Sequence, residues 1–196
     1  APPAADTGFA SATQHRQRNI ASRVLRDEDA GMTDLLVRLY DLPDVQHRPQ
    51  LAEHGVNIRR AMSAERHVVL AWVAETFGPA WRSEAARAFI RPVTTLWIAV
   101  RGDAVIGFAA YDCSMCGFFG PTGVDPAARG WGVGEALLFA TLHDMRAMEY
   151  GYAIIGGIGP EAFYRRWLDV SVIPGSQHGI YRGMLHSPGD APPDED

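Results

Sequence analysis

The segment 124–138 has the residue types of a loop that binds an anion. It reads Val-Asp-Pro-Ala-Ala-Arg-Gly-Trp-Gly-Val-Gly-Glu-Ala-Leu-Leu, and its pattern predicts the end of a strand joined to the start of a helix. The first turn of a helix has backbone N–H groups without an intrahelical partner and carries the positive end of the helix dipole, so it binds phosphate well. Glycines let the backbone approach the anion closely. A glycine-bearing loop without function is the alternative interpretation.

Several other classes of phosphate-binding protein are excluded. The dinucleotide fingerprint G-x-G-x-x-G would need a further glycine at Glu135 or Leu137. All 18 basic residues are arginine, and the chain has no lysine. Walker-loop nucleotide-binding proteins, pyridoxal phosphate enzymes and protein kinases each use a lysine, so none of these classes fits. Codon bias in a GC-rich, bacterial-like genome would also produce an arginine-only composition.

The segment resembles the coenzyme A loop of the Gcn5-related N-acetyltransferases, R/Q-x-x-G-x-G/A, with the family's upstream Val-x-Pro and downstream Leu-Leu. The resemblance covers about residues 94–185, roughly half of the chain. It implies that the strand before the loop splays from its neighbour and that the backbone N–H of Val124 bonds the thioester carbonyl. It also implies that the pyrophosphate of acetyl-CoA is held by the backbone of Arg129, Gly130, Trp131, Gly132, Val133 and Gly134.

The resemblance also implies a catalytic acid, since Ala162-Phe163-Tyr164-Arg165-Arg166 is similar to the family's x-F-Y-E-K stretch. Tyr164 is then the group that protonates the departing CoA thiolate. A phenol, with a pKa of about 10, carries its proton at neutral pH and so has one to donate to the leaving thiolate. Core packing is the alternative role of this tyrosine. The following Leu168-Asp169-Val170 and the preceding run from Gly156 to Gly159 depart from the family pattern.

The general base is not given by the resemblance, because the expected strand 117–123 bears no carboxylate. Asp112, at the end of the neighbouring strand, is the first candidate, and Glu161 and His178 follow it. Each of the three could instead be a solvated or capping residue. A water relay to bulk solvent is an equal alternative.

Charge and cysteine content limit the partners. The net charge is −5 with scattered arginines, so we expect no nucleic-acid partner. No run of about 18 apolar residues could cross a membrane, and the N-terminus lacks the features of a secretory signal. Cys113 and Cys116 have no second pair to complete a structural zinc site, so we expect free thiols in a reducing cytoplasm and no metal. A redox or metal-binding role of the pair is the alternative.

Periodicity predicts the elements that position these residues. The expected helices are 29–39 (with Met32, Leu35, Leu36 and Leu39 at helical spacing), 68–77, 83–89, 132–149 and one begun by Pro160. The polar stretch 43–57 carries no expected element. Pro121 should place a bulge in its strand or remove the strand's pairing partner, which would leave backbone free to bind a ligand. The expected strands are 20–25, 94–100, 104–111, 117–124, 152–155, 170–173 and 179–185.

Together these elements predict one α+β domain. With the resemblance, the fold is that of the Gcn5-related N-acetyltransferases: a mixed, mostly antiparallel central sheet of about six to seven strands, flanked by helices and splayed where acetyl-CoA binds. The domain should span 16–186, with acceptor-side helices at about 29–92 and the CoA-binding core at about 94–185. Residues 1–15 and the acidic 187–196 are expected to be disordered tails.

The resemblance implies an acetyl-CoA-dependent N-acetyltransferase that acts on a primary amine of a small molecule or peptide, by direct attack in a ternary complex. Members of the family acetylate antibiotics, amino sugars, polyamines, amino acids and protein N-termini, and the sequence does not choose among these acceptors. The sequence also leaves open whether the chain forms a homodimer. A non-catalytic acyl-CoA sensor or partner-binding module of the same fold is the alternative. The missing strand carboxylate favours that alternative, whereas the loop and Tyr164 favour the enzyme.

Overall fold

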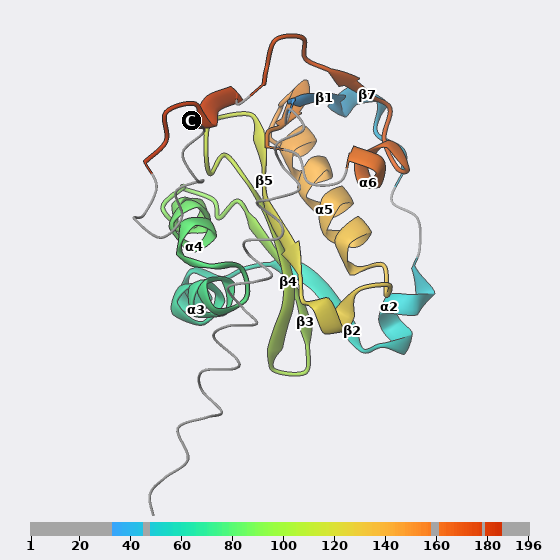
Figure 1. Cartoon of the computed structure of the whole chain (residues 1–196). Coiled ribbons are helices and arrows are strands. Elements are labelled where there is room, and N and C mark those ends of the chain that lie inside the picture. The colour runs from blue at the N-terminus through green and yellow to red at the C-terminus, as the bar shows by residue number, and fades with distance from the viewer. Residues whose placement is uncertain (1–32, 45–47, 158–160, 178, 186–196) are drawn as a thin grey trace, which may run out of the picture.

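The computed structural model of the chain describes residues 33–44, 48–157, 161–177 and 179–185. Their centre is one mixed seven-stranded sheet (Figure 1). The strands are β1 Leu35–Arg38, β2 Val56–Arg60, β3 Leu96–Arg101, β4 Ala104–Tyr111, β5 Phe118–Val124, β6 Tyr152–Ile155 and β7 Val170–Val172. Their order in the sheet is β2-β3-β4-β5-β6-β1-β7, and every neighbouring pair is antiparallel except β5 and β6, which are parallel. The α+β fold class is confirmed.

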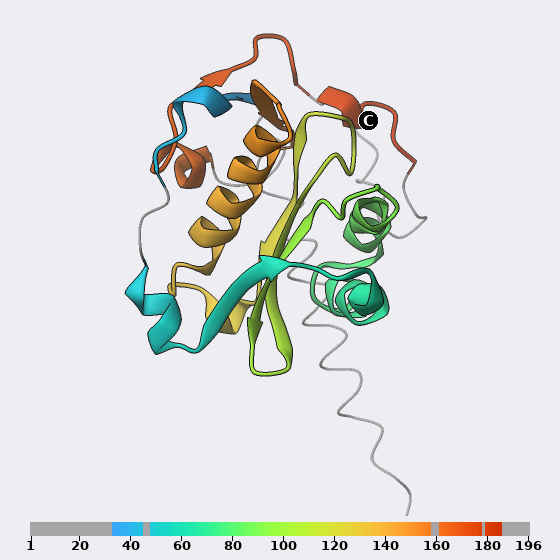
Figure 2. The same cartoon turned by 180° about the vertical axis from the view of Figure 1, so that it is seen from behind.

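Helices cover both faces of the sheet (Figures 1 and 2). One face carries α3 Arg66–Phe77 and α4 Pro79–Ala86; the other carries α5 Val133–Ala147 and the short α6 Glu161–Arg165. The five-residue α2, Pro49–Glu53, lies near the start of α5 in both views. Single 3₁₀ turns occupy Leu39–Asp41, Ser63–Glu65, Arg87–Phe89, Pro126–Ala128 and Gly179–Tyr181. None of the described helices is long and apolar enough to cross a membrane.

The predicted hairpin and its supporting helices are confirmed. β3 and β4 pair through the turn at Gly102, and successive β3 residues face opposite helix layers: Ile98 packs with the α3 and α4 side, whereas Ala99 packs with the α5 side. Helix α3 ends at Gly78, whose φ of +102° favours glycine. The two apolar faces of the sheet therefore bury two separate hydrophobic clusters.

Strand β5 has the irregularity that Pro121 predicts. Ala109 pairs with Thr122 and Tyr111 with Phe119, so β5 has one extra residue in this interval, which is a β-bulge. On its other side β5 pairs with β6 only at Phe118 and Phe119. From Gly120 onward β5 and β6 therefore separate, as the splayed sheet requires.

Two predicted elements near the ends of the described chain are wrong. The segment 29–39 is predicted as a helix, but Leu35–Arg38 within it form strand β1. This strand lies between β6 and β7 and is antiparallel to both. Leu35 and Val37 are fully buried on the α5 side, so the apolar residues alternate as in a strand. A short apolar run fits a buried strand and a buried helix equally well, and here pairing with β6 and β7 selects the strand. Where the strand at 179–185 is predicted, the structure has a 3₁₀ turn at Gly179–Tyr181 and no strand.

Some predictions concern parts of the chain outside the described residues: the strand at 20–25, the first part of the 29–39 segment, the role of Pro160 and both tails. The domain boundaries also stay predictions. The polar stretch 43–57, predicted without regular structure, contains α2 and the start of β2. After β7 the chain crosses over the end of the sheet toward α4 (Figure 1), where the Tyr181 hydroxyl donates a hydrogen bond to Glu84 Oε1 at 3.1 Å.

Candidate functional site

The loop between β5 and α5 leaves backbone N–H groups open at the start of the helix. Gly132 caps α5 with a φ of +82°, and Gly130 has a φ of +87°. The first intrahelical bond runs from Ala136 N to Gly132 O at 3.0 Å, so the three preceding helical N–H groups have no partner within the helix. A Cβ at Gly130 or Gly132 would have no heavy atom within 4 Å. The outer side of this turn therefore has room for an anion.

Side chains from distant segments hold Trp131 within the loop. His54, which follows α2, stacks on its ring with centroids 4.2 Å apart and an interplanar angle of 10°. The guanidinium of Arg101, at the end of β3, lies 5.2 Å from the ring centroid. The sequence alone does not point to either residue, because both lie outside the motif. Arg101 adds positive charge next to the glycines.

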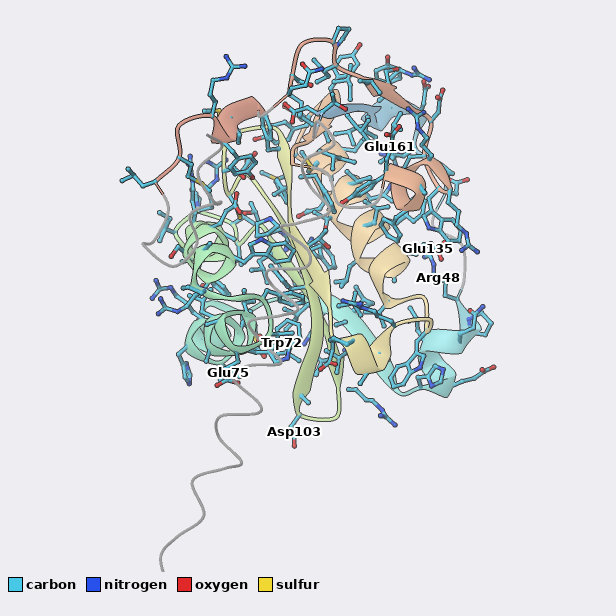
Figure 3. The ribbon with its side chains drawn as sticks, viewed as in Figure 1. Arg48, Trp72, Glu75, Asp103, Glu135 and Glu161 are labelled. Atoms are coloured by element: carbon cyan, nitrogen blue, oxygen red, sulfur yellow. The ribbon has the colours of Figure 1, made fainter. Side chains whose placement is uncertain are left out.

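An ion pair accompanies the first turn of α5. Arg48 Nη2 lies 2.7 Å from Glu135 Oε1, and their side chains are only 11% and 17% exposed. Figure 3 shows the two residues side by side, on the opposite side of the sheet from Trp72 and Glu75. A lone carboxylate in the first turn would repel a bound anion, and Arg48 neutralises that charge. Arg48 is a further residue that the motif does not reveal.

The end of β5 turns backbone N–H groups toward the side from which β6 has separated. Asp125 N donates to Ile106 O at 2.9 Å, so these two residues form a hydrogen-bonded pair of the antiparallel ladder. The next pair, Val124 with Gly107, is then a non-hydrogen-bonded pair, whose N–H groups point away from each other. The N–H of Val124 therefore points away from β4. This orientation fits the role that the resemblance implies for Val124.

Tyr164 lies at the point where β5 and β6 begin to separate. Its ring stands edge-on to that of Phe119, the last β5 residue paired with β6, with centroids 6.3 Å apart. The side chain is 6% exposed, and burial raises the pKa of Tyr164 to about 12. The neighbouring Phe163 reaches the loop between β5 and α5, because its ring would lie 3.6 Å from a Cβ at Gly134. Tyr164 thus lies beside the last paired residue of β5, and its neighbour Phe163 extends from there to the loop.

Asp112 lies at the opposite end of β5 in a buried network. Its carboxylate accepts hydrogen bonds from Arg91 Nη2 at 2.6 Å, the Tyr150 hydroxyl at 2.7 Å and the backbone N–H of Gly117 at 2.7 Å. The residue is 1% exposed and adopts a φ of +59°. These contacts support the alternative role of Asp112, which is to cap the turn that holds the two cysteines. Its role as a base stays a prediction.

We expect Asp112→Asn to act on stability. Asparagine tolerates the positive φ, but it cannot keep the charge opposite Arg91. Arg91 is partly solvated, with its side chain 31% exposed, so we expect a loss of about 2–3 kcal/mol in the free energy of unfolding, measured with urea. A variant of parental stability whose rate no longer falls at acidic pH would instead make Asp112 the base.

The remaining candidates are dispersed. Glu161 forms a surface ion pair with Arg165 on α6, and His178 lies outside the described residues. Cys113 is buried, which raises the pKa of its thiol to about 12, whereas Cys116 is exposed; neither forms a disulfide. Within the described ranges no three His, Cys, Asp or Glu side chains gather as metal ligands would.

One buried carboxylate near the site was not predicted from the sequence. Asp34, immediately before β1, is 7% exposed, and burial raises the pKa of its carboxyl. Leu35 pairs with Ile155 at the end of β6, which places Asp34 beside the glycines that follow β6. The sequence predicts a helix on the acceptor side at 29–39, so nothing in it indicates this neighbourhood.

No protein-family model matches the sequence, and no curated protein matches it either. The structure is similar to a GCN5-related glucosamine N-acetyltransferase region of a fungal multi-domain β-N-acetylglucosaminidase, with a TM-score of 0.60 and 13% identity over 80% of this chain and 22% of that chain. GCN5-related N-acetyltransferases from Kribbella flavida and Sphaerobacter thermophilus also match, with TM-scores of 0.49 and 0.48 and identities of 17% and 18%.

These alignments cover 82% and 77% of this chain, and 65% and 54% of the Kribbella and Sphaerobacter proteins. The chain therefore spans less than two thirds of the length of each of the three proteins. At 13% identity, the first match shows a common fold. In this chain, the seven-stranded mixed sheet and the short β5–β6 pairing, at Phe118 and Phe119, agree with the predicted architecture. The chain thus has the fold of the Gcn5-related N-acetyltransferases.

Proposed function

We propose that the protein is an acetyl-CoA-dependent N-acetyltransferase that acetylates a primary amine of a small molecule or peptide. One observation carries the proposal: the open, glycine-capped start of α5 follows the part of β5, Gly120 to Val124, that is not paired with β6. The open start of α5 offers backbone N–H groups to a pyrophosphate. The unpaired backbone of β5 offers an N–H group to the thioester carbonyl. The fold shared with a GCN5-related glucosamine N-acetyltransferase region supports the same function.

In this proposal the chain binds acetyl-CoA with backbone N–H groups from Arg129 to Gly134. The N–H of Val124 bonds the thioester carbonyl and stabilises the oxyanion that develops when the amine attacks. The amine forms a bond to the carbonyl carbon, and the bond from that carbon to sulfur breaks. Tyr164 then gives its proton to the departing thiolate, and the proton released from the acylated nitrogen restores the phenol. The amine attacks directly, without a covalent acyl-enzyme.

CoA release tests the activity. The protein is incubated with acetyl-CoA and a panel of aliphatic amines, amino sugars, polyamines, amino acids and peptides with free N-termini, and released CoA is measured with a thiol reagent. Because the exposed Cys116 would react with the reagent, the assay uses the Cys116→Ser variant. We expect saturable release with at least one amine class, matched by an equal amount of acetylated amine in the mass spectrum.

A non-catalytic acyl-CoA sensor is the second candidate, because β5 bears no carboxylate. A sensor would bind acetyl-CoA in calorimetry and release no CoA with any amine. Absence of acetyl-CoA binding would contradict both candidates. The cytoplasmic location, the absence of a nucleic-acid partner, the metal-free site and the homodimer left open by the sequence stay predictions.

The ion pair at the loop gives a separate prediction about affinity. Arg48→Met should weaken acetyl-CoA binding about tenfold, or roughly 1.4 kcal/mol, because it leaves the Glu135 carboxylate unneutralised beside the pyrophosphate. Replacing Glu135 with Gln in the same chain should restore most of the affinity, as measured by calorimetry. If the double variant binds as weakly as Arg48→Met alone, Arg48 acts on the ligand directly and the neutralising role is wrong.

A further inference from the structure

Three aspartates are buried within the described part of the chain, and one of them differs from the others. Asp112 pairs with Arg91 at 2.6 Å, and Asp144 pairs with Arg60 at 2.5 Å. Asp34 forms no ion pair with any described residue, although it is 7% exposed. A buried carboxylate without a cation is costly, so its position calls for a physical reason.

Asp34 lies where β5 and β6 separate. Its neighbour Leu35 pairs with Ile155 and faces the α5 side, so Asp34 faces the side of α3 and α4. A Cβ at Gly156 would lie 2.9 Å from the Phe118 ring and 3.4 Å from Asp34 Oδ1. The carboxylate and the Phe118 ring therefore both adjoin the backbone that follows β6.

Tyr164 approaches the same point from the opposite face. It contacts Phe119, which packs into the α5-side cluster, whereas Phe118, the residue before it in β5, points to the other face. The two strands separate immediately after this pair of phenylalanines. Asp34 and Tyr164 thus flank the end of the β5–β6 pairing from the two sides of the sheet. An acid and a base placed in this way could serve the leaving thiolate and the attacking amine separately.

The segment after β7 holds Asp34 in place. Ser176 Oγ accepts a hydrogen bond from the Asp34 backbone N–H at 2.8 Å, and Ile173 N donates to the Asp34 carbonyl at 2.9 Å. A Cβ at Gly179 would lie 3.0 Å from both carboxylate oxygens, a tight contact, and its φ of +40° also favours glycine. The backbone N–H of Gly157 also bonds the carboxylate and favours its charged form.

Among the described residues, two acidic side chains lie near Asp34, and Arg87 lies beyond them, where it donates to the Ser114 carbonyl at 3.2 Å. From the C-terminal segment comes Tyr181, whose pKa is raised to about 12, mainly by burial and further by the charges of Glu84 and Asp34. From α4 comes Glu84, which accepts hydrogen bonds from the hydroxyls of Tyr181 and Ser114. β5 contributes the apolar Phe118. The region therefore favours a cation, and an ammonium group is the cation that the proposed reaction brings.

We propose that Asp34 is the general base that takes the proton from the acceptor ammonium. This inference rests on the proposed N-acetyltransferase function and assigns the general base of that reaction to a residue. The ammonium gives one proton to the Asp34 carboxylate, the free amine attacks the thioester carbon, and Asp34 then releases the proton to solvent. The acceptor class is accordingly an amine that is protonated at neutral pH, such as an aliphatic amine or an amino sugar.

Asp34→Asn tests the role, since asparagine keeps the volume and can still accept a bond from Gly157 N–H but cannot take a proton. We expect kcat to fall by roughly 10² to 10⁴ and acetyl-CoA affinity to stay within about threefold. A base must be deprotonated to act, so the parental rate should fall as pH drops through the pKa of Asp34. Burial raises that pKa, so the fall should begin above the ordinary aspartate range, and the variant should lack it.

Asp103→Asn is the matched control, because Asp103 is an exposed aspartate at the tip of the β3–β4 hairpin (Figure 3). It should keep the parental rate and pH profile. Circular dichroism and acetyl-CoA affinity report whether each variant folds. If Asp34→Asn does not fold, Asp34→Glu takes over the test: moving the carboxylate by one methylene should lower kcat at least about tenfold while the acidic fall in rate persists.

The outcomes separate the two proposals. If the parent releases CoA and a folded Asp34→Asn keeps the parental kcat and acidic fall, the base assignment is overturned while the N-acetyltransferase function stands. The base assignment is likewise overturned if Asp34→Asn lowers only thermal stability, or if Asp34→Glu has the parental rate. If the parent releases no CoA with any amine although it binds acetyl-CoA, the proposed function fails and the base assignment fails with it.

Discussion

Tyr164→Phe is expected to lower turnover by roughly 10² to 10⁴ while leaving acetyl-CoA affinity nearly unchanged. The substitution removes only the hydroxyl, so the edge-on contact with Phe119 remains. Without the phenol, the thiolate must leave unprotonated or wait for water. Because burial holds the pKa of Tyr164 at about 12, the phenol keeps its proton throughout the neutral range. Its removal should therefore lower the rate without adding or removing a pH dependence between about pH 6 and 9.

Tyr111→Phe is the control for the loss of a buried hydroxyl. Tyr111 is 1% exposed on β4, packs into the same cluster as Tyr164, and has no assigned role in the reaction. Steady-state kinetics on the best amine of the panel compare the two variants. We expect the Tyr111 variant to turn over within a few-fold of the parent. If Tyr164→Phe does so too, water protonates the thiolate and Tyr164 has a packing role.

Gly132→Leu is expected to weaken acetyl-CoA binding by well over tenfold, a loss of more than about 1.4 kcal/mol. Gly132 caps α5 in a left-handed conformation, with φ at +82° and no heavy atom within 4 Å of a Cβ. The protein itself therefore has room for the side chain. The leucine would occupy the space that the pyrophosphate needs and would strain the turn that presents the helical N–H groups. Calorimetry with acetyl-CoA measures the effect.

Gly78→Leu separates strain from lost binding. Gly78 also has a positive φ, +102°, and open space around a Cβ, but it lies between α3 and α4 on the other side of the sheet. Its substitution should cost stability, since a φ of +102° with a ψ of 173° is a conformation almost confined to glycine and costs other residues about 1–3 kcal/mol, and it should leave acetyl-CoA affinity at the parental value. Parental affinity in the Gly132 variant would show that the loop does not bind the pyrophosphate.

Much of the fold could be predicted because its signals are local. The β3–β4 hairpin follows from two alternating apolar runs around one turn, and α5 follows from a helical stripe after a glycine cap. The bulge in β5 follows from a proline that cannot donate a ladder hydrogen bond. The candidate coenzyme A loop could also be identified from sequence, since its residues are contiguous. In each case the residues that interact are close along the chain.

The rest of the site depends on contacts between distant segments. Arg48 meets Glu135 across 87 positions, and Asp34 meets Ser176 across 142. The run Leu35–Arg38 becomes a strand only because β6 and β7 supply its hydrogen bonds from the far end of the chain.

The sequence by itself determined where the glycine loop lies, that Tyr164 is a candidate acid, and most of the helices and strands that carry both. Only the tertiary structure decided that β1 lies beside β6, that Asp34 therefore reaches the point where β5 and β6 separate, and that Asp112 is enclosed by Arg91, Tyr150 and Gly117. The physical reason is the range of the interactions. Capping, turns and periodicity act between near neighbours, whereas strand pairing and the burial of a carboxylate depend on which distant segments pack together.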